Sequence, residues 1–392
     1  MAESNVEEWQ PMDGTYALHN VAEFLSETTG ERRSVGVTPL NLPEDAIQLQ
    51  RVPESVRRSL NEVARDKMLH STAMEIRFVA EGSVRVTLSS GNAEGRNGVE
   101  VFRGDFHQVA ERSMLGPDPV TLDIDPLPQI DALLSRLDDA EGDGAEMARS
   151  LDWTFHPRVC RVRLPTHAGP LRLHAIEPAN GGSCRAPHPD ELPGHRLLAY
   201  GTSITHGASA TSPEMTYAAL TAYRLRADLI NLGSGGSAQC ERELADYIAS
   251  RDDWDLAILA LSVNMRGFSQ EEYRRRIAYM IRTVAGAHPL KPVFAITLWP
   301  FFCDLGFHGG AWRSASARAP RKAANEAKRM RQDLRDVVAD ASLPNTHLLE
   351  GPELFGPLAG LTTDLIHPSN LGMMAMAERL ATAVESQLPT AP

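Results

Sequence analysis

The sequence predicts an α/β protein in which an N-terminal β-sandwich of the jelly-roll kind precedes a C-terminal parallel sheet covered by helices on both faces. Apolar residues alternate with polar ones up to about residue 175, whereas after residue 195 short apolar runs alternate with helical segments. The segment 177–194 between them is rich in Pro and Gly. Because 392 residues exceed one ordinary domain, we place a mainly β domain at 1–185 and a second domain at 195–392.

Alternating apolar residues predict the strands of the N-terminal domain. The runs are bounded by Gly, Pro and Asn, which is typical of half-buried antiparallel strands, and they occupy 75–80, 82–88, 99–103, 159–164 and 171–175. Several such strands indicate a β-sandwich. We expect a short helix at 53–69, before these strands, and a polar, acidic loop at 128–150, between them.

Short apolar runs predict the strands of the second domain, at 197–200, 229–232, 256–261, 293–298 and 347–349. Helical segments separate or follow these runs, near 214–226, 239–250, 270–287, 313–341 and 370–386. Apolar strands that alternate with helices are typical of a parallel sheet whose two faces are both covered.

Composition argues against several classes of function. The 39 Lys and Arg residues against 51 Asp and Glu give a formal net charge of −12, which disfavours nucleic acid and anionic membranes as partners. The N-terminus has neither the basic nor the apolar region of a secretory signal, so we expect a soluble, cytoplasmic protein. The cysteines form no CxxC pair and no metal-ligand spacing occurs, so we expect no disulfide scaffold, no metal and no cofactor; they are Cys160, Cys184, Cys240 and Cys303.

Polar residues follow the predicted strands of the second domain, where ligands bind in open α/β sheets. Ser203 lies in a tight turn after the first strand, and a glycine-rich turn at 233–236 follows the second. Asn264 follows the third strand, and Asp364 and His367 lie shortly before the last helix. The order of these residues along the chain, and their placement at strand ends, make chance an unlikely origin for the whole set.

Together these residues can perform acyl transfer. Ser203 is the candidate nucleophile, His367 the general base, and Asp364 the carboxylate that orients the imidazole and stabilises its cation. The amides of Ser203 and Gly236 and the side chain of Asn264 are candidates for an oxyanion hole, in which each donor contributes about 10²–10³-fold in rate.

The same residues lie in four blocks that resemble those of the SGNH (GDSL-type) hydrolases, over roughly 195–390. The blocks are Tyr-Gly-Thr-Ser-Ile-Thr, Asn-Leu-Gly-x-Gly-Gly, Ser-Val-Asn and Asp-x-x-His. The resemblance implies a flavodoxin-like three-layer α/β/α fold and ester hydrolysis through an acyl-enzyme. It matches the family's nucleophile to Ser203, its oxyanion-hole residues to Gly236 and Asn264, and its Asp and His to Asp364 and His367.

Two blocks depart from the family's usual pattern. Gly-Thr-Ser replaces Gly-Asp-Ser, a variant found in esterases that carry an extra N-terminal β-domain. Ser262-Val263-Asn264-Met265 replaces Gly-x-Asn-Asp, which removes no named catalytic atom but changes the turn that aims Asn264.

Three rival interpretations fit less well. An α/β-hydrolase needs Gly-x-Ser-x-Gly, but Thr205 stands where the second glycine belongs. A dinucleotide-binding oxidoreductase matches the pattern Gly-x-Gly-x-x-Ala at 233–238, but Asp252 and Asp253 precede the next strand instead of ending it. A catalytically inactive carbohydrate-binding or interaction protein is the third rival, although the nucleophile and base of the site are both present.

We therefore expect a serine esterase that acts on small-acyl esters, and the resemblance favours acetyl esters of a carbohydrate or a small metabolite. A lipid or thioester acyl hydrolase of the same fold is the alternative. His206, close to the nucleophile, and Trp299, at the end of the fourth strand, are candidates for contact with substrate. An uncovered sheet edge in the β-domain would favour a homo-oligomer.

Overall fold

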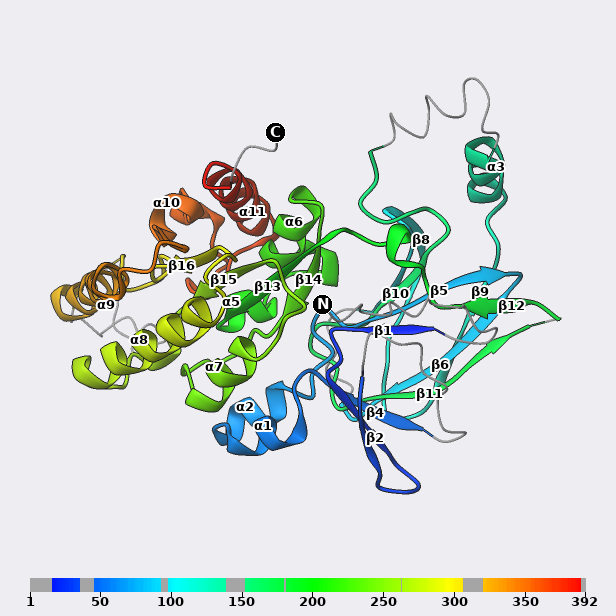
Figure 1. The fold of residues 1–392 in the computed structure, drawn as a ribbon, viewed down its shortest axis with the longest axis horizontal. Coiled ribbons are helices and arrows are strands. Elements are labelled where there is room, and N and C mark those ends of the chain that lie inside the picture. Colours follow the sequence, from blue (N-terminus) through cyan, green and yellow to red (C-terminus); the bar gives the residue numbers. More distant parts are fainter. Residues whose placement is uncertain are drawn as a thin grey trace, which may run out of the picture.

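The computed structural model describes residues 16–35, 46–92, 98–138, 152–179, 181–261, 263–305 and 320–388. Figure 1 shows a β-sandwich beside an α/β domain, with the chain passing from the first to the second. None of the described helices is long and apolar enough to cross a membrane.

Two six-stranded sheets form the sandwich, and their strands pair antiparallel throughout the described registers. The first has the order β1-β5-β10-β7-β8, with β12 also paired to β5. Its strands are β1 Ala17–His19, β5 Glu75–Glu81, β7 Val99–Arg103, β8 Phe106–Ser113, β10 Cys160–Arg163 and β12 Ser183–Arg185. The second has the order β3-β2-β4-β11-β6-β9, with β2 Glu23–Ser26, β3 Arg32–Ser34, β4 Ile47–Gln50, β6 Val84–Ser90, β9 Val120–Ile124 and β11 Leu171–Pro178.

The core of the sandwich explains the period of two in the sequence. On β6, Val84, Val86 and Leu88 are fully buried, while Arg85 between them is exposed. Successive side chains of a strand point to opposite faces, so one face packs against the other sheet and one meets water. The predicted β-sandwich is thus confirmed.

The second domain has one five-stranded parallel sheet in the order β14-β13-β15-β16-β17. Its strands are β13 His195–Gly201, β14 Ala227–Asn231, β15 Leu256–Ala260, β16 Val293–Ile296 and β17 Thr346–Leu349. The main helices are α6 Tyr217–Arg224, α7 Arg242–Ala249, α8 Gln270–Ala287, α9 Pro320–Ala341 and α11 Asn370–Glu385. Each predicted strand and helix of this domain is present, and α8 has the predicted ends.

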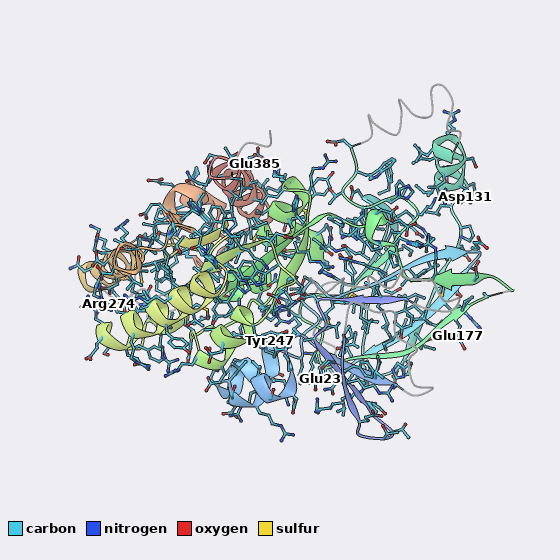
Figure 2. The ribbon with its side chains drawn as sticks, viewed as in Figure 1. Glu23, Asp131, Glu177, Tyr247, Arg274 and Glu385 are labelled. Carbon is cyan, nitrogen blue, oxygen red and sulfur yellow. The ribbon has the colours of Figure 1, made fainter. Side chains whose placement is uncertain are left out.

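Alternate residues of each strand enter different cores. Leu198 and Tyr200 of β13 pack with α7, α8 and α9, whereas Leu197 and Ala199 pack with α6 and α11. Figure 1 shows these two sets of helices on opposite faces of the sheet. Arg274 of α8 (Figure 2) joins α8 to α9 by ion pairs. The arrangement is the predicted three-layer α/β/α fold.

Two short helices from the N-terminal half complete the core of the second domain. The predicted helix at 53–69 is a pair, α1 Glu54–Ser59 and α2 Glu62–Lys67. Leu60, Ala64 and Met68 belong to the same hydrophobic core as α7 and α8, and α1 contacts α7. Glu23 of β2 (Figure 2) accepts a hydrogen bond from the first amide of α1, which links this pair to the sandwich. The packing therefore crosses from one domain into the other.

The segment predicted as an acidic loop at 128–150 begins instead with a helix, α3 Pro128–Asp138, and its remainder lies outside the described residues. Ile130, Leu133, Leu134 and Leu137 have helical spacing and are half-buried. The acidic residues around 138–143 concealed this pattern. The Pro- and Gly-rich segment 177–194 likewise contains the short strand β12.

Candidate active site

Ser203, His367 and Asp364 form a hydrogen-bonded series. The Ser203 hydroxyl donates to His367 Nε2 over 2.8 Å, and His367 Nδ1–H donates to Asp364 Oδ2 over 2.6 Å. Ser203 begins the four-residue helix α5 Ser203–His206 after β13, while Asp364 and His367 precede α11. Residues 164 positions apart thus meet at the carboxyl edge of the parallel sheet.

The carboxylate of Asp364 is held in one orientation by its neighbours. Its Oδ1 accepts hydrogen bonds from the Thr362 hydroxyl and from the amides of Ile366 and His367, at 2.8–2.9 Å. Burial alone would raise the pKa of Asp364, but these bonds and the one from the imidazole lower it to about 2. Leu365 between them has φ +57°, an uncommon conformation for a residue with a side chain. The carboxylate therefore stays ionised and aimed at His367.

The three N–H donors proposed from the sequence for an oxyanion hole have no acceptor among the described residues. They are the amide of Ser203, the amide of Gly236 and Nδ2 of Asn264. The Asn264 carbonyl oxygen accepts a hydrogen bond from the Ala238 amide over 3.1 Å. This bond ties the side chain to the loop that follows β14, residues 232–238, here called the glycine loop, and leaves Nδ2 for a ligand. Gly236 has φ +74°, which glycine adopts without strain. These are the donors predicted for an oxyanion hole.

The glycine loop packs closely against α5, the short helix that begins with Ser203. A Cβ at Gly233 would lie 2.4 Å from the His206 amide nitrogen, so no larger residue fits there. The Asn231 side chain donates to the Thr205 carbonyl over 2.7 Å and accepts from the Gly233 amide over 2.8 Å. Asn231 belongs to a block recognised in the sequence, but its part in joining the loop to the turn was not predicted.

His206 and Trp299 do not occupy the positions expected of substrate contacts. His206 is completely buried; the Gly235 amide donates to its Nδ1 over 3.0 Å and its Nε2–H donates to the Thr166 carbonyl over 3.3 Å. Trp299 is 2% exposed and packs edge-on against Tyr217. Neither side chain offers surface to a substrate, because one supports the glycine loop and the other fills the core.

His206 belongs to a cluster of three histidines at the domain interface. Ligand-capable nitrogens of His70, His167 and His206 lie within 4.8 Å of one another. Burial and the nearby Arg51 hold the pKa of His206 well below its usual range, and burial, with Lys67 next, lowers the pKa of His70 to about 3. The number of donors would suit a metal, but both nitrogens of His206 are engaged and the cations Arg51 and Lys67 lie close by. The donor set therefore does not fit a divalent cation.

The neutral state of His206 predicts sensitivity to acid. In the unfolded chain this imidazole binds a proton near pH 6.5, whereas in the folded protein it does not, so the unfolded state binds more protons as the pH falls. As the pH falls from 7.5 to 5.0, this difference lowers the free energy of unfolding, by at most about 2 kcal/mol for one imidazole. We expect urea titrations to show that His206→Gln loses less stability than the wild type over this range.

The exposed His195 provides the control for that comparison. His195→Gln should show the same pH dependence as the wild type. If His206→Gln and the wild type lost stability in parallel, His206 would be protonated in the folded protein and the hydrogen bond from Gly235 would be wrongly assigned.

Comparison with known proteins agrees with this geometry. Residues 195–385 match the model of the GDSL-like Lipase/Acylhydrolase family. No curated protein sequence matches the chain. Among solved structures, the chain is similar to a protein from Bacteroides ovatus described as a GDSL-like lipase, with 18% identity, TM-score 0.64 and coverage of 95% of this chain and 97% of that one.

Two further structures have the same overall fold. The salicylyl-acyltransferase SsfX3 from a tetracycline biosynthetic pathway is 18% identical, with TM-score 0.68 and coverage of 94% of this chain and 99% of that one. A family two carbohydrate esterase from Cellvibrio japonicus is 14% identical, with TM-score 0.54 and coverage of 81% and 89%. The sequence blocks, the fold and the match to the family model agree that residues 195–385 form a GDSL-like lipase/acylhydrolase domain.

Proposed function

We propose that this carboxylic ester hydrolase is a serine esterase that removes small acyl groups, with acetyl esters of a carbohydrate or small metabolite as substrates. The observation that carries the proposal is the hydrogen-bonded series Ser203–His367–Asp364. The acetylated carbohydrate is chosen because of the similarity in fold to a family two carbohydrate esterase.

The geometry supports a two-step reaction. His367 Nε2 takes the hydroxyl proton as Ser203 Oγ bonds to the ester carbonyl carbon, and the carbonyl oxygen becomes an oxyanion held by the amides of Ser203 and Gly236 and by Asn264. Collapse of this intermediate breaks the bond to the alcohol, which leaves with the proton from His367. Water then attacks the acyl-serine and gives a proton to the same nitrogen. When this second intermediate breaks its bond to Oγ, the acid is released and His367 returns the proton to Ser203 Oγ. Asp364 stabilises the imidazolium at both stages.

Acyl-chain length should separate the small-acyl esterase from the lipid or thioester alternative. With p-nitrophenyl esters from acetate to palmitate, we expect kcat/KM to be highest for acetate and at least about tenfold lower for octanoate, because a pocket for a small acyl group excludes the longer chain. A maximum at eight carbons or more would instead favour the lipid hydrolase.

Adding an alcohol acceptor, which the similarity to an acyltransferase suggests, would show whether a fraction of the acyl-enzyme transfers its acyl group to the alcohol instead of to water.

Covalent labelling tests the active state independently of substrate. A fluorophosphonate should modify Ser203 in the wild type, with the phosphorus bound to Oγ and fluoride released. Failure to label, together with no hydrolysis of any ester, would favour the inactive carbohydrate-binding protein.

A further inference from the structure

Side chains from the N-terminal half donate hydrogen bonds to carbonyls of the glycine loop and of the residue before it. Arg51 Nη1 donates to the carbonyls of Asn231 and Gly233, over 2.9 and 3.0 Å. Asn20 Nδ2 donates to the same Asn231 carbonyl over 3.1 Å, and Asn61 Nδ2 donates to the Ser237 carbonyl over 2.9 Å. These contacts bracket the loop on both sides of Gly236, the candidate oxyanion donor.

Arg51 is unusual because it is a completely buried cation that has no carboxylate partner among the described residues. Its remaining donors reach the carbonyls of His70 and Lys67, at the end of α2. Burial lowers the pKa of Arg51 to about 9, which leaves the guanidinium charged at neutral pH. A buried charge without a partner is costly. Here the charge binds four carbonyls, one in the glycine loop and one at the end of β14 that leads into it, so the guanidinium holds the start of the loop by charge-assisted hydrogen bonds.

A further contact, through His206, fixes the middle of the glycine loop. Nδ1 of His206 accepts from the Gly235 amide, and the Thr166 carbonyl, from the N-terminal half, fixes the tautomer that makes this possible. With the Gly235 amide engaged, the Gly236 amide is the one that remains for an oxyanion. The position of the loop therefore depends on Arg51, Asn61 and Thr166, all of which precede the catalytic domain.

We propose that Arg51 and Asn61 are positioning residues for the oxyanion loop, so that the N-terminal β-domain and its helix pair form part of the catalytic apparatus. This inference rests on the proposed function. Donors of an oxyanion hole contribute only when they are aimed at the developing charge, and a misplacement of about 1 Å can cost 10²-fold in rate. Arg51 is completely buried and Asn61 caps α2, so we expect little effect on the ground-state complex.

Arg51→Lys and Asn61→Ser test the proposal. Lysine keeps the charge but lacks the fork, and serine keeps the N-cap oxygen of α2 but lacks the amide donor. We expect kcat for p-nitrophenyl acetate to fall about 10–100-fold in Arg51→Lys and about 3–10-fold in Asn61→Ser, with KM within about threefold of the wild type. Each protein is labelled to completion with a fluorophosphonate, and its rate is divided by the fraction of molecules labelled at Ser203. Misfolded protein is then not counted.

Asn345→Ser is the matched control. This buried asparagine also holds a loop through its Nδ2, which donates to the carbonyls of Ala285, His288 and Lys291, but it lies at the opposite edge of the sheet, before β17. We expect Asn345→Ser to lower Tm and to leave kcat per labelled Ser203 unchanged.

The outcomes separate the two proposals. If Ser203→Ala were as active as the wild type, the proposed function would fail. If Ser203→Ala were inactive while Arg51→Lys and Asn61→Ser kept the wild-type kcat per labelled site, or changed it no more than Asn345→Ser does, the positioning role alone would fail. One equivalent of zinc in the purified protein, lost in His70→Gln, would also overturn it, because a metal would then hold this side of the loop.

Discussion

Replacing Ser203 with alanine is expected to lower kcat/KM for p-nitrophenyl acetate by at least about 10⁴-fold. In the proposed mechanism Ser203 Oγ is the atom that bonds to the acyl carbon, and without it the reaction must proceed by direct attack of water. The oxyanion donors remain in the variant, so a residual rate above that of the uncatalysed reaction should persist. Steady-state kinetics on both proteins, with the variant purified away from host esterases, measures the loss.

His367→Ala should cost about as much as Ser203→Ala, and the double variant should cost no more than either, because the two residues act as one unit. Ser386→Ala, on an exposed serine after α11, is the control and should keep full activity. Retention of a tenth of the wild-type activity in Ser203→Ala would be incompatible with this serine as the nucleophile.

The contact between Ser203, His367 and Asp364 could be anticipated because local sequence marks each of them. Ser203 follows β13, and Asp364 and His367 lie three residues apart before a helix, so the geometry of a parallel sheet brings them to one edge. The burial of His206 and Trp299 could not be predicted. Burial depends on what packs against a residue, and Thr166 and Tyr217, which cover these two side chains, are distant in sequence or carry no pattern of their own.

The second domain was predicted more completely than the first for a related reason. Its inner strands, such as β15 and β16, are buried on both faces and its helices have apolar stripes, so these elements are visible in their own residues. The strands β1–β4 have three or four residues each and include polar segments such as that at 32–34, which leaves no alternating run to detect. Arg51 follows one of these strands, 180 positions before the loop it binds, and no motif surrounds it.

Arg77→Met is expected to lower the free energy of unfolding by about 3–5 kcal/mol, because it breaks a buried ion network between the two domains. Arg77 of β5 binds both oxygens of Asp228 of β14, at 2.6 and 2.7 Å, and its Nε donates to Glu75 over 2.8 Å. All three are at least 96% buried. Burial would raise the pKa of Asp228 and Glu75, but the arginines around them hold both below their usual range, so both carboxylates are charged at neutral pH.

In Arg77→Met, Asp228 keeps His19, 3.2 Å away, as its one side-chain partner among the described residues. A carboxylate that has lost its guanidinium in the interior is strongly destabilising. Glu75 is affected less, since Arg161 and Arg163 also contact it.

The double variant Arg77→Met/Asp228→Leu removes the unpaired charge and should recover part of the lost stability. The control Arg172→Met breaks a partly exposed pair with Glu27 and should cost no more than about 1 kcal/mol. Urea unfolding followed by tryptophan fluorescence measures all three. If Arg77→Met cost no more than Arg172→Met, water or movement of the domains would be solvating Asp228, and the network would not fix the β-domain against the edge strand of the catalytic sheet.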